Sequence, residues 1–214
     1  MVVAPRLSRP RALPILVLAL AGALAACSAL RAADDGPVPE RIARLLPADI
    51  VLLGEQHDAP EHHALERESV EALVARRQLA ALALEMAEEG RTTAPLSTAA
   101  TEAQVQAALA WDAKAWPWAD YAPAVMTAVR AGVPVLGANL PRARMRDAMA
   151  DVSLDAQLAD AALRAQQAAV REGHCGLLPE SQIVPVTRVQ IARDRAMAQT
   201  LAEQPRGPGQ VVLL

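Results

Sequence analysis

Three of the four histidines of this 214-residue sequence fall within seven residues, directly after a short apolar run. The stretch from Ile50 to His63 reads IVLLGEQHDAPEHH and places Glu55 two residues before His57. His62 and His63 lie in the first turn of an expected helix, where the positive end of the dipole keeps an imidazole neutral and able to ligate. A carboxylate among neutral imidazoles suits acid–base catalysis or the ligation of iron or zinc, and the residue types alone leave these open.

Short buried strands are expected to position these groups. The run Ile50–Leu53 is too short for a helix and rich in β-branched residues, which is typical of a strand buried on both faces. Gly54 ends this run, and Pro60 fits the first position of a helix that extends to about residue 77. A second apolar run, Leu79–Met86, ends in a carboxylate at Glu85.

A helix of this length between two strands predicts a right-handed parallel crossover. Glu85 should therefore emerge at the same edge of the sheet as Glu55. A third strand ends at Asn139, and Pro134 near its start favours an edge position in the sheet. Ligands of open α/β sheets bind at the carboxyl edge of the strands, so this edge is the expected site.

All three tryptophans and the only tyrosine lie in the segment Trp111–Tyr121, although aromatic residues make up 2% of the chain. One interpretation is a hydrophobic anchor that holds a loop onto the domain. The other is a wall for a flat, apolar ligand, with the Tyr121 hydroxyl as its polar group. A helix is expected to begin only after this segment, at about Pro123.

The last third of the sequence predicts two long helices. Ser153 should cap the first, and Gly173 should follow its last turn before a loop that holds His174 and Cys175. The second should run over about 186–203. Its inward stripe carries Arg193 and Asp194, which are costly there unless they are paired or functional. An Arg193–Asp194 network that only braces the fold is one interpretation, and a functional site is the other.

The N-terminal segment is expected to be a lipoprotein signal. Residues 1–26 carry three arginines and then a Leu/Ala run, the pattern of a secretory signal too short to span a membrane. Leu24-Ala25-Ala26-Cys27 resembles a bacterial lipobox, which implies cleavage before Cys27 and lipidation of its thiol, for example with palmitate. Residues 27–40 are then a tether and residues 41–214 the domain. Ser28 indicates the outer membrane of a Gram-negative cell envelope.

Charge and cysteine content exclude other classes of protein. The formal net charge is −3 at pH 7 and no basic cluster occurs, so nothing indicates nucleic-acid binding. With Cys27 lipidated, Cys175 is the other cysteine, and no internal disulfide is expected. The sequence also lacks the HExxH, P-loop, GxSxG and GxGxxG patterns.

Six motifs occur in a fixed order: LLGEQHDAPEHH, LALEM, the Trp-rich segment ending in WADY, VLGANLPRA, HCGLLP and QxxRDxxMA at Gln190–Ala198. Together they resemble the ChaN-like haem-binding lipoproteins, a branch of a superfamily that also holds Tiki-type proteins and erythromycin-esterase-like hydrolases. The resemblance runs from about Ile50 to Leu214. It implies a three-layer α/β/α domain with a mainly parallel central sheet, and a surface lipoprotein that binds haem and takes part in haem-iron uptake.

Haem binding requires an apolar slot, aromatic contacts, an iron ligand and arginine for the propionates. We expect Tyr121 to be the axial ligand, because a phenolate suits ferric iron, with His174 second and Cys175 third. The remaining expected haem-binding residues are Trp116, Trp118, Arg193, Glu55, His57, His63, Glu85 and Asn139. The resemblance leaves open a homodimer and an outer-membrane transport system as partner.

Two other functions compete with haem binding. The first is a metal- or Glu/His-dependent hydrolase of the erythromycin-esterase/Tiki type, built on Glu55 and His57. The hydrolase branches also carry a GxxH motif near the C-terminus, which this sequence does not contain. The second is an interaction module with an inert cleft. A final strand is expected from Gln210 to Leu214, and because it ends without a polar residue the sequence is expected to be incomplete there.

Overall fold

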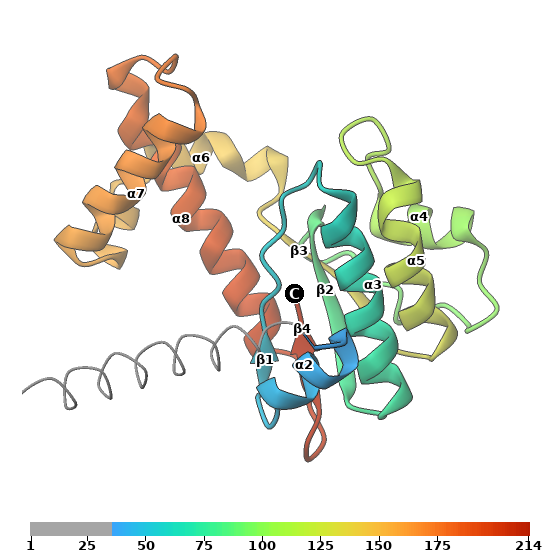
Figure 1. Cartoon of the computed structure of the whole chain (residues 1–214). Helices are drawn as coiled ribbons and strands as arrows, with labels where there is room; N and C mark the ends of the chain where they lie inside the picture. The colour runs from blue at the N-terminus through green and yellow to red at the C-terminus, as the bar shows by residue number, and fades with distance from the viewer. Residues whose placement is uncertain (1–35) are drawn as a thin grey trace, which may run out of the picture.

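The computed structural model describes residues 36–214, whose centre is a four-stranded, all-parallel β-sheet (Figure 1). The strand order is β1-β4-β2-β3. The strands are β1 (Ile50–Val51), β2 (Leu79–Glu88), β3 (Val135–Asn139) and β4 (Val211–Leu213). The predicted α/β class with a parallel sheet is confirmed, and β3 occupies the edge position that Pro134 had indicated. The expected lipidation at Cys27 lies outside the described residues.

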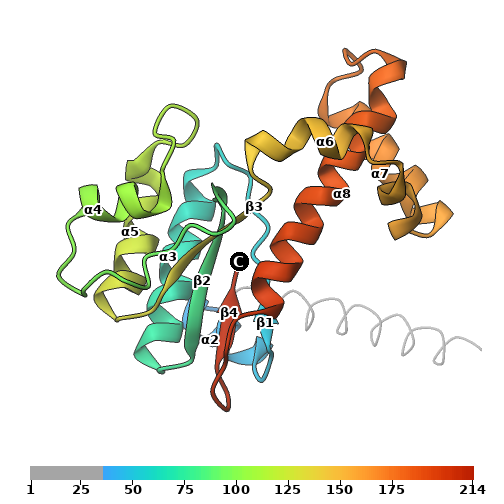
Figure 2. The same ribbon diagram turned by 180° about the vertical axis from the view of Figure 1, so that it is seen from behind.

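Helices cover both faces of the sheet, which confirms the three-layer α/β/α architecture (Figures 1 and 2). The helices are α2 (Val38–Leu45), α3 (Pro60–Ala75), α4 (Glu102–Leu109), α5 (Trp118–Arg130), α6 (Met145–Ala150), α7 (Asp160–Gly173) and α8 (Glu180–Ala202), with 3-10 turns at Arg142–Arg144 and Val152–Gln157. The α2–α5 group lies on one face and α8 on the other. Within residues 36–214, no helix combines the length and apolar character needed to cross a membrane.

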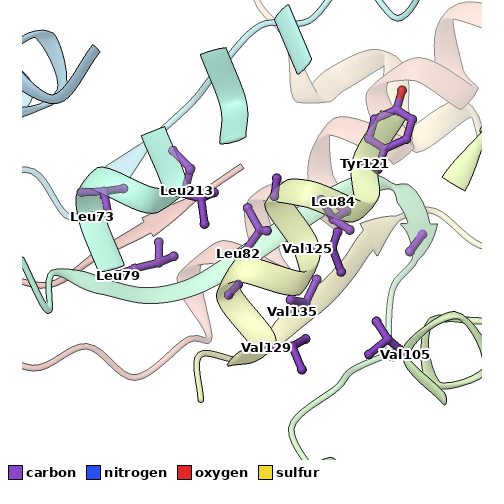
Figure 3. Packing of buried hydrophobic residues seen from close by; sticks show 14 of the residues in the cluster. Leu73, Leu79, Leu82, Leu84, Val105, Tyr121, Val125, Val129, Val135 and Leu213 are labelled. Atoms are coloured by element: carbon purple, nitrogen blue, oxygen red, sulfur yellow. The ribbon is translucent and has the colours of Figure 1, made fainter. Parts of the chain in front are cut away.

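The two faces of β2 carry side chains of different size. Leu82 and Leu84 pack among buried residues of α3 and α5 in the larger core (Figure 3). Ala81 and Ala83 face the other way, toward Leu201 of α8. Small side chains let a helix backbone approach a sheet closely, so the alternation of Leu and Ala along one strand builds a thick layer on one side and a thin one on the other.

Two helices begin earlier than the sequence predicts, and both carry a proline as their sixth residue. We expected one to begin at about Pro123 and the other just after Pro185, because a proline inside a helix lacks the N–H that bonds to the preceding turn. The structure instead begins α5 at Trp118 and α8 at Glu180, and each proline lies in the second turn. The expected starts were therefore wrong by about one turn.

The predicted cap at Ser153 is also wrong. Asp151 is the capping residue: its Oδ1 accepts bonds from Ser153 N at 2.9 Å and Ser153 Oγ at 2.6 Å, and a 3-10 turn follows. The long helix α7 starts only at Asp160. Gly173 is the last residue of α7, and the left-handed backbone after the helix falls on Cys175 and Gly176, whose φ angles are 53° and 68°.

Candidate functional site

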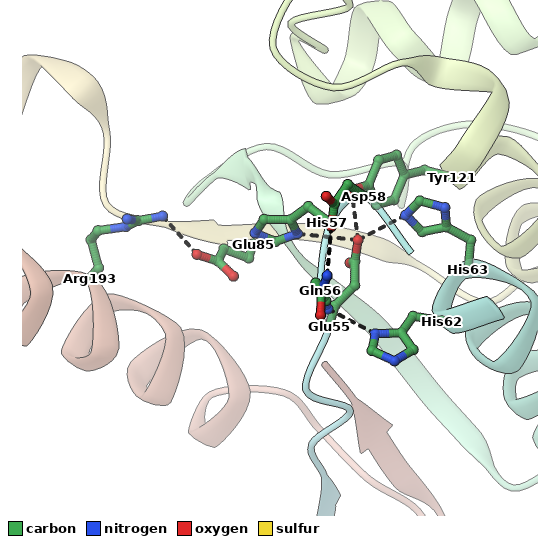
Figure 4. Close-up of polar contacts among 9 residues, drawn as sticks. All are labelled: Glu55, Gln56, His57, Asp58, His62, His63, Glu85, Tyr121 and Arg193. Atoms are coloured by element: carbon green, nitrogen blue, oxygen red, sulfur yellow. Dashed lines mark hydrogen bonds and ion pairs between the residues drawn. The ribbon is translucent and has the colours of Figure 1, made fainter. Parts of the chain in front are cut away.

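The carboxyl ends of β1 and β2 and their following residues carry two separate groups of polar side chains (Figure 4). The first, the Glu55 cluster, consists of Glu55, His57, His63, Glu66 and Tyr121. The second, the Glu85 cluster, consists of Glu85, Asn139 and Arg193. The expectation that the strands end at one edge of the sheet therefore placed Glu55, Glu85 and Asn139 together, but it did not indicate that they divide into two groups.

Glu55 is the centre of its cluster, with 5% of its side chain exposed. Its Oε1 atom accepts a bond from the Tyr121 hydroxyl at 2.9 Å and lies 2.9 Å from His63 Nε2. His57 Nδ1 lies 3.2 Å from the same oxygen. Three donors from the β1–α3 loop, α3 and α5 thus converge on one carboxylate oxygen, which fixes the relative positions of these elements.

His62 does not join this cluster. Its Nδ1 accepts the backbone N–H of Gln56 at 2.9 Å, so the ring closes the turn that leads into α3. The two adjacent histidines therefore have different roles in the structure: His63 contacts Glu55, and His62 stabilises the loop.

Glu66 is a member of the cluster that the sequence reasoning missed. Burial, together with the charge of Glu55 and a hydrogen bond to it, raises the pKa of Glu66 to about 8. Burial alone would raise the pKa of Glu55 as well, but hydrogen bonds from Tyr121, Glu66, His57 and His63 hold the Glu55 pKa below its ordinary value. At neutral pH the pair therefore holds one proton, on Glu66. The position of Glu66 in the sequence could have indicated that it joins this cluster, because Glu66 lies one helical turn from both His63 and the buried Val70.

Tyr121 does not present the phenolate expected of an axial ligand. It is 2% exposed and its hydroxyl donates to Glu55. Burial, then the hydrogen bond to Glu55 and the nearby carboxylates, raise the pKa of Tyr121 above its ordinary value. In this structure the phenol is a buried donor to a carboxylate, and the expectation that Tyr121 ligates iron stays a prediction.

The tryptophan segment serves mainly as the local anchor that one interpretation proposed. Trp111 packs against Trp118 and Tyr121 with ring centroids 5.1 and 5.4 Å apart. Its indole N–H donates to the Trp116 carbonyl at 2.9 Å, and that of Trp118 donates to Glu102 at 2.7 Å. Trp118 is thus turned toward α4 and lines neither of the cavities at the strand ends, and its expected role in haem binding stays a prediction.

The Glu85 cluster joins the sheet to α8. Arg193 donates to Glu85 Oε1 at 2.7 Å and to Asn139 Oδ1 at 2.9 Å, and Asn139 in turn donates to the Glu85 carbonyl at 2.8 Å. The polar stripe of α8 is therefore paired with the strand ends. The alternative of an Arg193–Asp194 network is wrong, because Asp194 is exposed and accepts from Gln190.

Two adjoining cavities open at this edge and share Glu85 and Met86. One, of about 350 Å³, extends between the sheet and α3 and α5, with Glu55, Glu66 and Tyr121 among mainly apolar walls. The other, of about 420 Å³, is hereafter the Trp116 cleft. Its lining includes Trp116, Glu85, Met86, Asn139, Arg142, Met145 and Arg193.

His174 and Cys175 lie elsewhere. Both belong to the turn between α7 and α8, at the end of α8 that is remote from the sheet (Figures 1 and 2). His174 Nδ1 lies 2.7 Å from the Val170 carbonyl one turn earlier, and Cys175 is exposed. Neither joins the expected residues at the sheet edge. Within residues 36–214, no group of three or more His, Cys, Asp or Glu side chains is arranged to hold a metal ion.

Fold and site together define an α/β/α domain with a cleft at the carboxyl edge of a parallel sheet. The family described as "Haem-binding uptake, Tiki superfamily, ChaN" matches residues 41–214, and the chain belongs to this family.

A solved structure, "Cofacial heme binding to ChaN of Campylobacter jejuni", superposes with a TM-score of 0.65 at 24% identity over 82% of this chain and 73% of that one. This likeness supports the fold. No curated protein matches the sequence.

Proposed function

We propose that the chain binds haem in the Trp116 cleft. Two observations together carry the proposal. The chain belongs to a haem-binding family, and Trp116, Arg142 and Arg193 line one cleft at the carboxyl edge of the sheet, where ligands of open α/β sheets bind. The cleft lies beside the apolar cavity and shares its wall at Met86. When bound, haem would supply an iron centre, and its protein surroundings would set how that iron is held.

The cleft contains the aromatic surface, the apolar contacts and the arginines that haem requires. Trp116 offers an aromatic surface, and Met86 and Met145 offer apolar contacts. Arg193 is already neutralised by Glu85. Arg142 is more available, because its side chain is 75% exposed and its contact with Asp112 is 3.4 Å. We therefore assign Arg142, which the sequence analysis did not select, as the main partner of the propionates.

Titration of the full-length protein with hemin tests this assignment. We expect a Soret band that saturates, and an increase in Kd of about tenfold for Arg142→Ala, as for the loss of one charge-assisted contact. Arg146→Ala is the matched control, because Arg146 is exposed on the same segment and does not line the cleft. Trp116→Ala should weaken binding and Trp118→Ala should not. Saturation without any difference between these pairs would place haem outside the cleft.

We further propose that the protein is anchored by lipid at Cys27 in the outer membrane and serves haem-iron uptake. The support is the lipobox-like sequence that ends at Cys27 and the family description. Labelling with a palmitate analogue should tag the wild type and Cys175→Ala but not Cys27→Ala. Label that remains on Cys27→Ala would contradict the anchor. Slower growth of a deletion strain on haem as sole iron source would support uptake, and unchanged growth would oppose it.

A second candidate function is acid–base hydrolysis at the Glu55 cluster. The observation that favours it is the pairing of a buried carboxylate with a 41% exposed imidazole at His57. This function would replace haem binding if hemin gave no saturating band while ester or amide substrates turned over and Glu55→Gln abolished that turnover.

A further inference from the structure

Large apolar side chains are exposed at two places in the part of the chain that the structure describes. One is the segment from the end of α2 to the residue after β1, with Leu45, Ile50 and Leu52. The other is the group of helices at the end of α8 remote from the sheet, with Met149, Val152, Leu177 and Val184. Several exposed apolar side chains near one another indicate a surface that contacts something outside the domain.

Helix α2 is held on the domain by one apolar side chain and leaves a second one uncovered. Ile42 is 3% exposed and belongs to the larger core, and it secures α2 on α3. Leu45, three residues later, is 52% exposed. It lines a groove of about 170 Å³ between α2 and α3, together with Leu53 and Leu65. Since Ile42 already secures the helix, Leu45 is available for a contact outside the domain.

A cation lies beside this leucine. Arg41 precedes Leu45 by one helical turn, so the two side chains share one face of α2, and both line the groove. Within residues 36–214, no hydrogen bond or ion pair holds the Arg41 guanidinium. An arginine next to an exposed leucine on a surface helix suits the boundary of a lipid bilayer, because guanidinium groups bind phosphates while the apolar side chain enters the acyl region.

The length of the chain before α2 brings this face to a lipid surface. Eight residues separate Cys27 from Gly36, and an extended chain spans at most about 3.6 Å per residue, so Gly36 lies within about 30 Å of a lipid-anchored Cys27. Helix α2 begins two residues later. Leu177 lies at the end of α8 remote from α2, and α8, with 23 residues, is itself about 35 Å long (Figures 1 and 2). Of the two apolar surfaces, the one on α2 is therefore kept near the anchor.

We propose that the face of α2 formed by Arg41 and Leu45 docks on the phospholipid surface in which Cys27 is anchored. Leu45 enters the outer part of the acyl region, and Arg41 binds lipid phosphates. The inference rests on the proposed lipid anchor and adds the orientation of the domain on the membrane. Helix α2 lies on the β1 side of the sheet, whereas the Trp116 cleft lies at the opposite edge, beside β3. Docking through α2 thus leaves the cleft open.

The accessibility of spin labels on the lipidated protein tests the docking, in vesicles of phosphatidylethanolamine and phosphatidylglycerol. A nitroxide is attached at Leu45→Cys or, as the matched control, at Leu177→Cys, whose side chain is also exposed. Both variants carry Cys175→Ala, so that no other thiol is free. We expect the ratio of collisions with membrane-soluble oxygen to collisions with an aqueous nickel chelate to be several-fold higher at position 45 than at position 177.

A charge reversal tests the role of the arginine. Arg41→Glu should lower the ratio at position 45 toward that at position 177, because a carboxylate repels lipid phosphates. Arg164→Glu is its control, since it changes the net charge equally on the exposed side of α7 and should leave the ratio unchanged.

The possible failures are distinguishable. Wild-type protein that does not float with the vesicles would overturn the lipid anchor itself. Flotation with equal ratios at positions 45 and 177 would overturn the docking alone. A label at position 45 that is shielded from both oxygen and the nickel chelate would also overturn it, because a second protein molecule would then cover this face of α2.

Discussion

Glu55 follows β1 and Glu85 lies near the carboxyl end of β2, both at the same edge of the sheet, yet their surroundings give them opposite characters. Glu55 is 5% exposed, contacts Tyr121, His57 and His63, and has a second carboxyl beside it. Glu85 is 33% exposed and is paired with the guanidinium of Arg193. Glu55 therefore holds together a cluster of hydrogen-bonded, titratable side chains, whereas Glu85 forms an ion pair that joins the sheet to α8.

The difference shows that solvent access, more than position on the sheet, decides what a strand-end carboxylate does. A buried carboxylate without a cation must be stabilised by hydrogen bonds, and it raises the pKa of an acidic group beside it. An exposed one can rely on a single cation and on water.

Glu55→Ala should be the most destabilising substitution in the site, by about 3 kcal/mol, because it leaves the buried Tyr121 hydroxyl and the His63 ring without their acceptor. The equivalent truncation Glu85→Ala should cost about 1 kcal/mol, since water can reach its partners. Urea denaturation of both variants measures the two losses. Equal losses would mean that burial does not distinguish the two clusters.

The Glu55–Glu66 pair should make the stability of the fold depend on pH. The pKa of Glu66 is about 8 in the folded protein and 4.5 in its ordinary state, so the folded chain binds more protons between these values. Stability therefore falls as pH rises from about 4.5 to about 8. Because Glu66 is only partly shielded from water, we expect Glu66→Gln to gain about 2 kcal/mol over wild type at pH 9 and little at pH 4.5.

Denaturation midpoints at pH 5, 7 and 9 check this sign. Glu68→Gln is the matched control, because Glu68 lies on the same helix with 42% of its side chain exposed. Its difference from wild type should stay constant over this range. A gain for Glu66→Gln that shrank with rising pH would show that the proton is not held between Glu55 and Glu66.

The Arg193–Glu85 pair should show the smallest effect. A double-mutant cycle with Arg193→Ala and Glu85→Ala should give a coupling of at most about 1 kcal/mol, because both side chains are partly exposed at 25% and 33%. Added salt should reduce the coupling. A salt-independent coupling of several kcal/mol would instead show that the Arg193–Glu85 pair behaves like the buried Glu55 cluster.

Periodicity and strand-end chemistry were sufficient to predict the sheet edge. Apolar runs before Glu55 and Glu85, with a helix between them, allow few other arrangements. Arg193 could be selected for the same reason, because a charge in an inward stripe requires a partner. Its partner could not be predicted: Glu85 is 108 residues away in the sequence, whereas the neighbouring Asp194 was the local choice.

The residues that were misjudged depend on contacts between distant elements. Tyr121 became buried because its hydroxyl meets Glu55, 66 residues earlier. Glu66 lies in the charged stretch LERESVE, which is typical of a solvated helix face. His174 was grouped with the site through its motif, and only the length of α8 shows that it lies far from the sheet. Local patterns carry no information on such distances.

The location of iron in crystals of the haem-loaded protein tests the central claim most directly. An anomalous difference map recorded at the iron edge should show one peak per chain in the Trp116 cleft, with the propionates toward Arg142. A peak at the α7–α8 turn beside His174 and Cys175, or one remote from both Trp116 and Arg142, would contradict the account.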